Sequence, residues 1–421
     1  MIVKDYIKRF ENYGFGMFVH FGLYSIIGKG EWAKAVFNIP QDEYAELMKS
    51  FNPKHDWAEK LVLAAKNAGC KYITLTARHH DGFSLYDTCG LNDYDAPHSL
   101  CRRDLIKEFV DACNKESIKP FFYHTLLDWY EPHYNTDFPT YLKYLQKSIE
   151  ILCRNYGEIG GFWFDGMWSK PNENWEEDTL YGIIRKYQPD AMIINNTGLG
   201  ARGELGHIEL DSVTFERGRP QPINFEGSPK YIASEMCQVF GSVWGYAKDD
   251  LSYIAPKAII EDLCICRKCG SNMLLNVGPM GDGMLRNIDA AYLELIGQWT
   301  QCYGEAIYLP KPCNIEVKSP NGDFVLQDGK SYYLFHYGCV MKGDANVVIK
   351  DQDSEKTLLR LPGKVLSATW LDDDSPLHLS TFKESNDDKA CNEMLVIAPS
   401  DYEYGRHLTV RVAKIVIECY Q

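Results

Sequence analysis

The stretch Gly161-Phe-Trp-Phe-Asp165-Gly166 is an apolar run that ends in an acidic residue and a glycine. Its length and aromatic content are typical of a buried strand. Similar runs at Tyr72–Thr76 and Pro120–Tyr123 are also followed by polar residues. This repetition decides the fold class, because buried strands that alternate with helices form parallel sheets.

Six such strands are predicted in the first three-quarters of the chain, and amphipathic patterns between them predict helices, for example at residues 56–68 and 104–115. Six strands over roughly 300 residues favour a (β/α)8-like barrel over a doubly wound sheet. No Gly-x-Gly-x-x-Gly follows the first strand, which argues against a dinucleotide-binding domain. The predicted strands are Phe15–Phe21, Tyr72–Thr76, Pro120–Tyr123, Gly161–Phe164, Met192–Ile194 and Met273–Val277.

After about residue 310 the pattern changes to short β-like segments separated by turn residues. Alternation of Leu408, Val410 and Val412 with polar residues is typical of a half-buried antiparallel strand. We therefore predict a catalytic barrel over residues 1–310 and a β-sandwich over residues 311–421. The strands of the β-sandwich are expected at Phe324–Leu326, Tyr332–His336, Ala345–Ile349, Lys364–Leu371, Glu393–Ile397 and His407–Glu418.

The chain of 421 residues has 44 Lys and Arg against 58 Asp and Glu, a net charge of −14. Negative charge repels phosphate backbones and anionic lipids, so we expect neither nucleic acid nor a membrane as a partner. The first residues form no apolar run of signal-peptide length, and no stretch has transmembrane length. These features favour a cytoplasmic protein.

The 14 cysteines are scattered along the chain, a distribution that fits reduced thiols in a cytosol. Cys264, Cys266 and Cys269 form a cluster that resembles a metal site. They lie in a predicted helix that ends at Gly270, and no second Cys or His group at ligand spacing lies nearby. The sequence therefore predicts neither a metal nor another cofactor.

Polar residues follow the predicted strands, where the catalytic groups of parallel barrels lie. Each of them alone is more often a core or capping residue, but their recurrence at successive strand ends favours a functional site. Sugar hydroxyls need donors and acceptors, sugar rings pack on aromatic faces, and glycosidic cleavage needs two carboxyl groups, of which Asp165 is one candidate. The hydroxyl-binding candidates are His20, Glu31, His79 and His80, and the packing candidates are Trp32, Tyr123 and Trp163.

Several motifs together resemble the α-L-fucosidases of glycoside hydrolase family 29, in order from residue 15 to about residue 280. They are Phe15-Gly-Met-Phe-Val-His-Phe-Gly, Glu31-Trp32, Arg78-His-His-Asp-Gly-Phe, Asp128-Trp129, Phe162-Trp-Phe-Asp-Gly, Glu235-Met-Cys, Trp244-Gly-Tyr and Leu274-Leu-Asn-Val-Gly-Pro.

The resemblance implies an exo-acting hydrolase that releases L-fucose from oligosaccharides or glycoconjugates with retention of configuration. It implies Asp165 as the nucleophile, and Trp163 and Tyr123 as pocket residues that exclude water around the C5-methyl group. The residues implied to bind fucose hydroxyls are His20, His79, His80, Glu31 and Trp32.

Three positions depart from the family pattern or match it ambiguously. Glu216, in Val213-Thr-Phe-Glu, and Glu235, in Ser234-Glu-Met-Cys, both match motifs for the acid/base, and we favour Glu216. Thr197 stands where the family usually has an arginine that touches the sugar, and Arg202 is a candidate substitute.

Two other functions remain open. A metal-dependent barrel hydrolase would use His20, His79, His80 and Asp165, or the cluster His79-His80-Asp81 as ligands. Such enzymes usually carry His-x-His at the first strand, whereas this chain has only His20 there. A fucose-binding protein without activity would lack the nucleophile, yet Asp165 is present.

Overall fold

The computed structural model describes residues 2–226, 228–337, 340–342, 357–383, 393–397, 401–403 and 409–419. The chain forms two compact units. One contains Met1–Ala255 and Ser271–Gly297, and the other contains Pro256–Gly270 and Gln298–Gln421. Across the described ranges, no helix combines the length and apolar character needed to span a bilayer.

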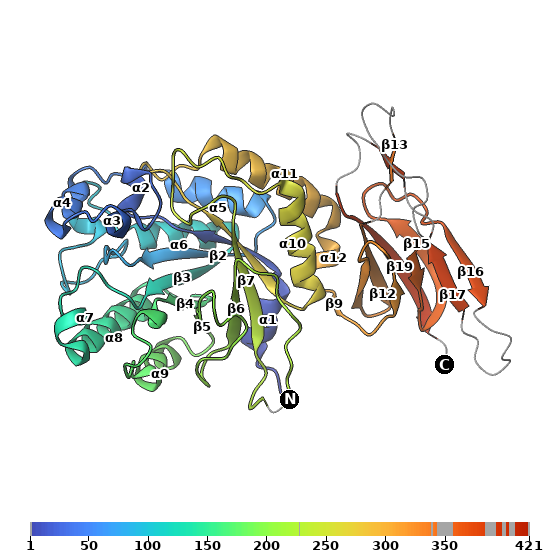
Figure 1. Ribbon diagram of the computed structural model, residues 1–421, viewed down its shortest axis with the longest axis horizontal. Helices are drawn as coiled ribbons and strands as arrows, with labels where there is room; N and C mark the ends of the chain where they lie inside the picture. The colour runs from blue at the N-terminus through green and yellow to red at the C-terminus, as the bar shows by residue number, and fades with distance from the viewer. Residues whose placement is uncertain are drawn as a thin grey trace. The chain divides into compact units, whose positions relative to one another are not determined.

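The first unit contains a closed barrel of eight parallel strands in sequence order, which confirms the predicted barrel (Figure 1). Two of its strands, β6 and β7, were not among the six predicted. Both carry buried polar side chains, such as Thr214 in β6 and Glu235 in β7, which interrupt the apolar runs. The barrel strands are β1 Phe15–Val19, β2 Tyr72–Arg78, β3 Lys119–Thr125, β4 Gly161–Asp165, β5 Met192–Asn195, β6 Ser212–Glu216, β7 Ala233–Val239 and β8 Asn272–Val277.

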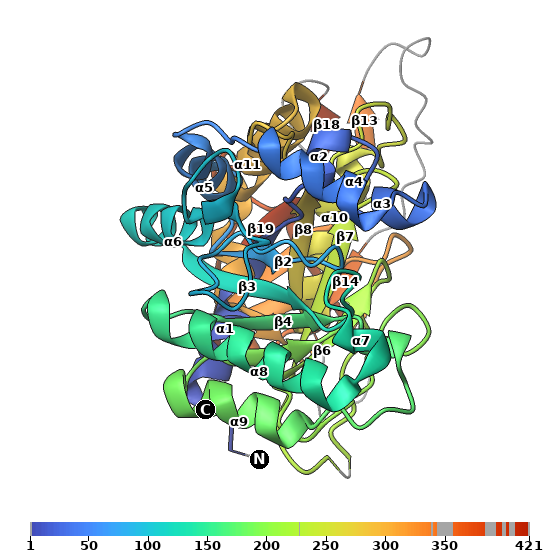
Figure 2. The same cartoon turned by 90° about the vertical axis from the view of Figure 1, so that its left-hand side faces the viewer.

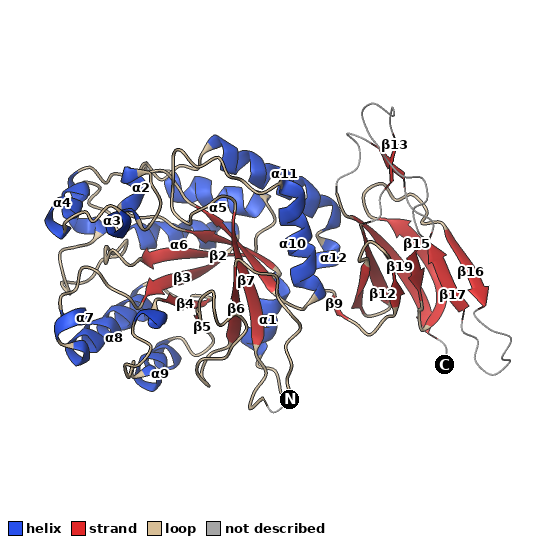
Figure 3. Ribbon diagram, in the orientation of Figure 1, coloured by secondary structure: helices blue, strands red, loops and turns tan. Residues whose placement is uncertain are grey.

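Amphipathic helices pack on the outside of the barrel (Figures 2 and 3), and α5 and α6 match the helical patterns predicted at residues 56–68 and 104–115. The helices of this part are α1 Asp5–Tyr13, α2 Tyr24–Ile27, α3 Ala33–Val36, α4 Gln41–Ala45, α5 Trp57–Asn67, α6 Leu105–Glu116, α7 His133–Thr136, α8 Phe138–Asn155 and α9 Glu177–Tyr187. Short 3-10 turns occur at η1 Glu46–Lys49, η2 Ala96–His98 and η3 Met167–Ser169. Helix α11, Asn287–Tyr303, begins in this unit and ends in the other.

Aromatic rings fill the barrel interior. Tyr72, Phe121, Tyr123 and Trp163 belong to one buried cluster, to which Phe10 of α1 also contributes. The Tyr72 ring lies so close to β1 that a Cβ at Gly16 would come within 2.4 Å of it. Tyr123 and Trp163 stack with ring centroids 5.8 Å apart. The Tyr123 hydroxyl donates to Asp165, and the Trp163 indole N–H donates to Glu235.

The second unit contains α10 Pro256–Lys268, which was predicted as a helix, α12 Glu305–Tyr308, two antiparallel sheets and a parallel pair of short strands, Val340–Lys342 and Asp401–Glu403. A five-stranded and a four-stranded sheet share one hydrophobic cluster, to which Leu334 and Ile415 contribute from the first and Leu359 and Leu379 from the second. The predicted antiparallel character of these two sheets is confirmed, and the sandwich stays a prediction, which the shared cluster supports.

Four predicted C-terminal strands agree with the structure to within two residues at each end, whereas the strand predicted at His407–Glu418 begins only at Arg411, because Val410 has a φ of 51° that a strand does not allow. Strand β16 was not predicted, and the predicted strand Ala345–Ile349 lies outside the described residues. Short strands such as β9 and β10 had no signal of their own in the sequence. The strands are β9 Lys311–Pro312, β10 Val317–Lys318, β11 Phe324–Asp328, β12 Ser331–His336, β13 Val340–Lys342, β14 Thr357–Leu359, β15 Gly363–Trp370, β16 Leu379–Lys383, β17 Glu393–Ile397, β18 Asp401–Glu403 and β19 Arg411–Cys419.

Candidate active site

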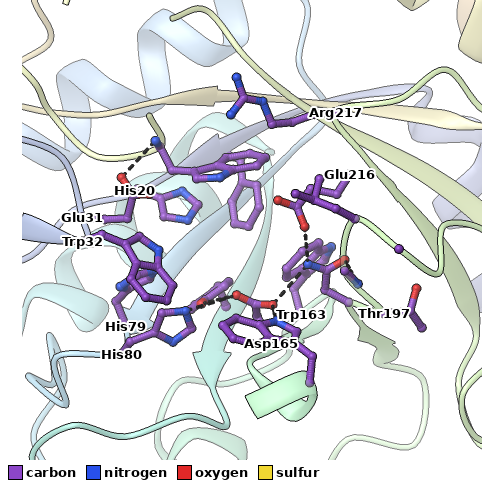
Figure 4. Close-up of a pocket in the computed structure, with 18 of the residues that line it drawn as sticks. His20, Glu31, Trp32, His79, His80, Trp163, Asp165, Thr197, Glu216 and Arg217 are labelled. Atoms are coloured by element: carbon purple, nitrogen blue, oxygen red, sulfur yellow. Dashed lines mark hydrogen bonds and ion pairs between the residues drawn. The ribbon is translucent and has the colours of Figure 1, made fainter. Parts of the chain in front are cut away.

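A cavity of about 630 Å³ opens at the carboxyl ends of the barrel strands (Figure 4). It contains every site residue predicted from the sequence except Glu235. Its wall is completed by Trp168, by the segment 196–201 and by Arg217, Ser242 and Trp244. The residues from the sequence prediction that line it are His20, Glu31, Trp32, His79, His80, Tyr123, Trp163, Asp165 and Glu216.

Asp165 ends β4 and faces the cavity. Tyr123 Oη donates to its Oδ2 at 3.0 Å, and Trp168 Nε1 and Asn196 Nδ2 each donate to its Oδ1 at 3.2 Å. The chain turns at Gly166, which has φ +97° and where a Cβ would lie 2.7 Å from Leu127. The tight turn and the three donors hold the carboxylate in one orientation.

Glu216 ends β6 and accepts a hydrogen bond at 2.8 Å from the same Asn196 amide nitrogen that bonds Asp165. The amide is fixed in turn, because Thr214 Oγ1 and Gly198 N both donate to its oxygen. Burial raises the pKa of Glu216, and the negative charge of Asp165 raises it further, whereas the Asn196 bond lowers it. A carboxyl group with a raised pKa is suited to act as an acid near neutral pH.

Glu235, in β7, lies in the barrel interior and does not line the cavity. Tyr72 Oη donates to one of its oxygens, and Trp163 Nε1 donates to the other at 2.9 Å. Burial raises the pKa of Glu235 to about 7. Of the two glutamates that matched acid/base motifs, the geometry therefore brings only Glu216 to the cavity wall beside Asp165.

Three buried histidines form one side of the cavity. The rings of His79 and His80 lie 4.2 Å apart, and His79 stacks on Tyr123 with an interplanar angle of 18°. Burial lowers the pKa of His20 to about 3 and also lowers the pKa of His79 and of His80. Neutral imidazoles offer one donor and one acceptor each, which suits hydroxyl groups better than anions.

Glu31 holds a loop of the cavity wall. One of its carboxylate oxygens accepts hydrogen bonds from the backbone N–H groups of Trp244 and Gly245, at 3.0 and 2.7 Å. Burial raises the pKa of Glu31, and these backbone bonds counteract the rise. Trp32 lies at the mouth, 37% exposed, with its ring edge-on to His80. The two neighbours in the Glu31-Trp32 motif thus have different positions, one buried and one at the opening.

Several cavity residues were not predicted as site residues. Trp168 lies two residues beyond the glycine that follows Asp165, in a loop whose shape the sequence does not reveal. Asn196 lies in a segment noted in the sequence only because Thr197 departs from the family pattern. Arg202, the candidate substitute for the missing arginine, does not line the cavity and donates to the backbone oxygen of Glu216, whereas Arg217 does line it.

The metal-site hypotheses from the sequence can be compared with the side-chain arrangement. In the ranges that the structure describes, no group of three or more His, Cys, Asp or Glu side chains is arranged to hold a metal ion. This applies to His79, His80 and Asp81 and to Cys264, Cys266 and Cys269. Asp81 is instead bonded by Tyr44 Oη at 2.8 Å.

The chain is similar in sequence to known proteins. Residues 3–305 match the family model described as α-L-fucosidase. The chain is 28% identical to the tissue α-L-fucosidase of Rattus norvegicus over 336 residues, which are 73% of this chain and 71% of the rat protein. It is 26% identical to the tissue α-L-fucosidase of Homo sapiens over 401 residues, 88% of this chain and 84% of the human protein.

Solved structures are similar over nearly the whole chain. The α-L-fucosidase isoenzyme 1 from Paenibacillus thiaminolyticus has a TM-score of 0.80 at 28% identity, with 98% of this chain and 99% of that chain covered. A covalent intermediate of an α-L-fucosidase from Bacteroides thetaiotaomicron, trapped with 2-fluoro-fucosyl fluoride in a glutamate-to-glutamine mutant, has a TM-score of 0.80 at 25% identity. The similar region covers 99% of this chain and 97% of the chain from Bacteroides thetaiotaomicron.

Proposed function

The chain belongs to the α-L-fucosidase family, and on that premise we propose that its cavity hydrolyses terminal α-L-fucosyl residues of glycans with retention of configuration. In this proposal Asp165 is the nucleophile and Glu216 is the acid/base. The observation that carries the assignment is the Asn196 amide, whose single nitrogen bonds both carboxylates.

The bridge also limits the distance between the two carboxylates. The bonded oxygens of Asp165 and Glu216 lie 3.2 and 2.8 Å from the same nitrogen, so the distance between these oxygens cannot exceed the sum of the two lengths. Retaining glycosidases place their two carboxyl groups roughly 5–5.5 Å apart, whereas inverting enzymes leave room for a water molecule between them. The geometry supports the retaining mechanism.

The reaction proceeds in two displacements. Asp165 attacks the anomeric carbon, and the bond to the leaving oxygen breaks as Glu216 transfers its proton to that oxygen. The fucosyl group is then an ester of Asp165. Glu216, now ionised, removes a proton from water, and this water cleaves the ester to give fucose and free Asp165. Neutral His20, His79 and His80 bind hydroxyl groups without placing a positive charge beside the nucleophile.

The mouth of the cavity indicates where the leaving group lies. Trp32 and Trp168 are partly exposed there, with ring centroids 6.2 Å apart and an interplanar angle of 21°. Aromatic faces of this kind pack well against sugar rings. We propose a fucosylated glycan as the substrate, with its next sugar against these indoles.

Azide rescue distinguishes the roles of the carboxylates. Asp165→Gly should lower kcat on an aryl α-L-fucoside by about 10³-fold or more. Azide should then replace the missing carboxylate and give the β-fucosyl azide, because it attacks opposite the leaving group. Glu216→Ala should still form the ester with an activated aryl fucoside, and azide should give the α-fucosyl azide with net retention.

Glu235→Ala is the matched control, since Glu235 is a buried carboxyl group outside the cavity. It should give no azide product. Formation of the α-fucosyl azide by Glu235→Ala, with none from Glu216→Ala, would overturn the assignment of Glu216. Near-wild-type turnover by Asp165→Gly would overturn the whole proposal.

A further inference from the structure

His80 is hydrogen-bonded on its far side to a short chain of groups that ends in a backbone carbonyl. Its Nδ1 lies 2.7 Å from the Thr125 hydroxyl oxygen, and that hydroxyl donates to the carbonyl oxygen of Leu127. A carbonyl oxygen cannot donate, so the hydroxyl proton belongs to the Leu127 bond. The hydroxyl oxygen must then accept from His80, which requires the proton on Nδ1.

His20 has an equivalent arrangement built from different residues. Its Nδ1 lies 2.6 Å from Asn276 Oδ1, and Asn276 Nδ2 donates to the carbonyl oxygen of Trp244 at 2.6 Å. The Trp244 carbonyl can only accept, so it fixes which end of the amide faces it. The amide oxygen therefore faces His20, which must also carry its proton on Nδ1.

We propose that Thr125 and Asn276 are positioning residues that fix His80 and His20 in the Nδ1–H tautomer, so that both rings present an unprotonated Nε2 to the hydroxyl groups of the sugar. This inference rests on the proposed function for its sugar ligand, but the tautomers themselves are a property of the protein without substrate. Both histidines thus accept hydrogen bonds from the sugar, and neither donates one.

The tautomer of His80 matters because its Nε2 lies 3.5 Å from Asp165 Oδ2. With a proton on Nε2, the neutral ring would donate to the nucleophile and would occupy one of its lone pairs. With the proton on Nδ1, no hydrogen lies between the two atoms, and Oδ2 keeps only the bond from Tyr123. The nucleophile is then free on that side, and a sugar hydroxyl can donate to His80 in the space between them.

Thr125→Val tests the arrangement at His80, because valine has nearly the same shape and no hydroxyl. Nδ1 would then lose the hydroxyl oxygen that accepts its proton, so the ring should change to the Nε2–H tautomer and donate to Asp165. We expect kcat/KM on an aryl α-L-fucoside to fall by about 10- to 100-fold. Thr125→Ser should restore most of the activity. Thr74→Val is the matched control: Thr74 is buried in β2 and does not line the cavity.

The direct measurement is ¹⁵N NMR of the ligand-free enzyme with labelled histidine, with His80 and His20 assigned through His80→Gln and His20→Gln. The wild-type protein should show a bound proton on Nδ1 of both rings. In Thr125→Val the proton of His80 alone should move from Nδ1 to Nε2. Asn276→Leu should move that of His20 alone. A proton on Nε2 of either ring in the wild-type protein would overturn the inference for that ring.

Activity lost in Thr125→Val without a change of tautomer would also overturn it, because Thr125 would then act through packing. If Thr125→Val does not fold, the wild-type spectrum still decides the question. An Nδ1–H tautomer in an enzyme that hydrolyses no fucoside would leave the inference intact and refute the proposed function, so the two can fail separately.

Discussion

Replacing Asn196 with alanine would perturb both carboxylates of the site through one side chain. The Asn196 bond to Glu216 favours the ionised form of that carboxyl group, so it lowers the pKa of Glu216 against the effect of burial. Without this bond, the pKa of Glu216 should rise further. Asp165 would lose one of its two Oδ1 donors and keep the one from Trp168.

The size of the effect follows from the strength of the lost bond. A hydrogen bond to a charged group contributes roughly 1.5–3 kcal/mol. Water can enter the open cavity and replace part of it, which leaves about 1.4 kcal/mol. That free energy corresponds to about one pH unit in a titration. The weaker support of Asp165 should also lower kcat at the optimum by about tenfold, since 1.4 kcal/mol is a factor of ten in rate.

The assay is the pH dependence of kcat/KM on an aryl α-L-fucoside with a poor leaving group, for which protonation by the acid is needed. Its alkaline limb reports the essential acid of the free enzyme. In Asn196→Ala this limb should move up by about one pH unit. Asn195→Ala is the matched control, because that amide bonds Tyr181 and Met167 rather than a carboxylate. An alkaline limb that stays in place or moves down in Asn196→Ala would refute the reasoning.

Three further substitutions have defined outcomes. Burial raises the pKa of Glu235 to about 7 from an ordinary 4.5. Its protonation therefore contributes stability that is complete below pH 4.5 and is lost as the pH rises to about 7. The free energy of unfolding in urea should fall less over this pH range in Glu235→Gln than in the wild type, and an identical pH profile would contradict the reasoning. Gly16→Ala should lower the free energy of unfolding by about 1–3 kcal/mol, because its Cβ would lie 2.4 Å from the Tyr72 ring; an unchanged thermal midpoint would show that the ring moves freely. Trp168→Phe keeps an aromatic ring but loses the donor to Asp165 Oδ1, so kcat should fall about five- to tenfold; steady-state kinetics in which only KM changes would show that Trp168 acts on binding alone.

The sequence was sufficient for the barrel because most strands are uninterrupted apolar runs. It missed β6 and β7 because their buried polar residues, such as Glu235 and Thr214, resemble surface residues in a linear pattern. Those polar groups are stable inside the barrel only because partners from other strands satisfy them, as Tyr72 and Trp163 do for Glu235. No local pattern reports such partners.

The same limit applies to the site. Residues at strand ends, such as His20 and Asp165, were predictable because a parallel barrel places all strand ends on one rim. Trp168 and Asn196 reach the cavity from loops, and the choice between Glu216 and Glu235 depends on which way each side chain points. Strand β7 directs Glu235 into the aromatic interior, whereas Glu216 is the last residue of β6 and reaches the rim.

The two carboxylates of the cavity have different surroundings, and this difference can account for the different roles proposed for them. Asp165 receives three hydrogen bonds, from Tyr123, Trp168 and Asn196, which stabilise a negative charge and hold the oxygens in place for attack. Glu216 shares one of these donors, is partly desolvated and faces the charge of Asp165, and the burial and the charge raise its pKa, as the role of an acid requires. Once Asp165 becomes an ester, its negative charge disappears. The part of the rise in the pKa of Glu216 that this charge caused is then lost, while the part caused by burial remains. Glu216 gives its proton to the leaving group in the step that forms the ester, and it then remains ionised as the base for water. The shared Asn196 therefore couples the charge of the nucleophile to the protonation of the acid, which is the change of role that a double displacement requires.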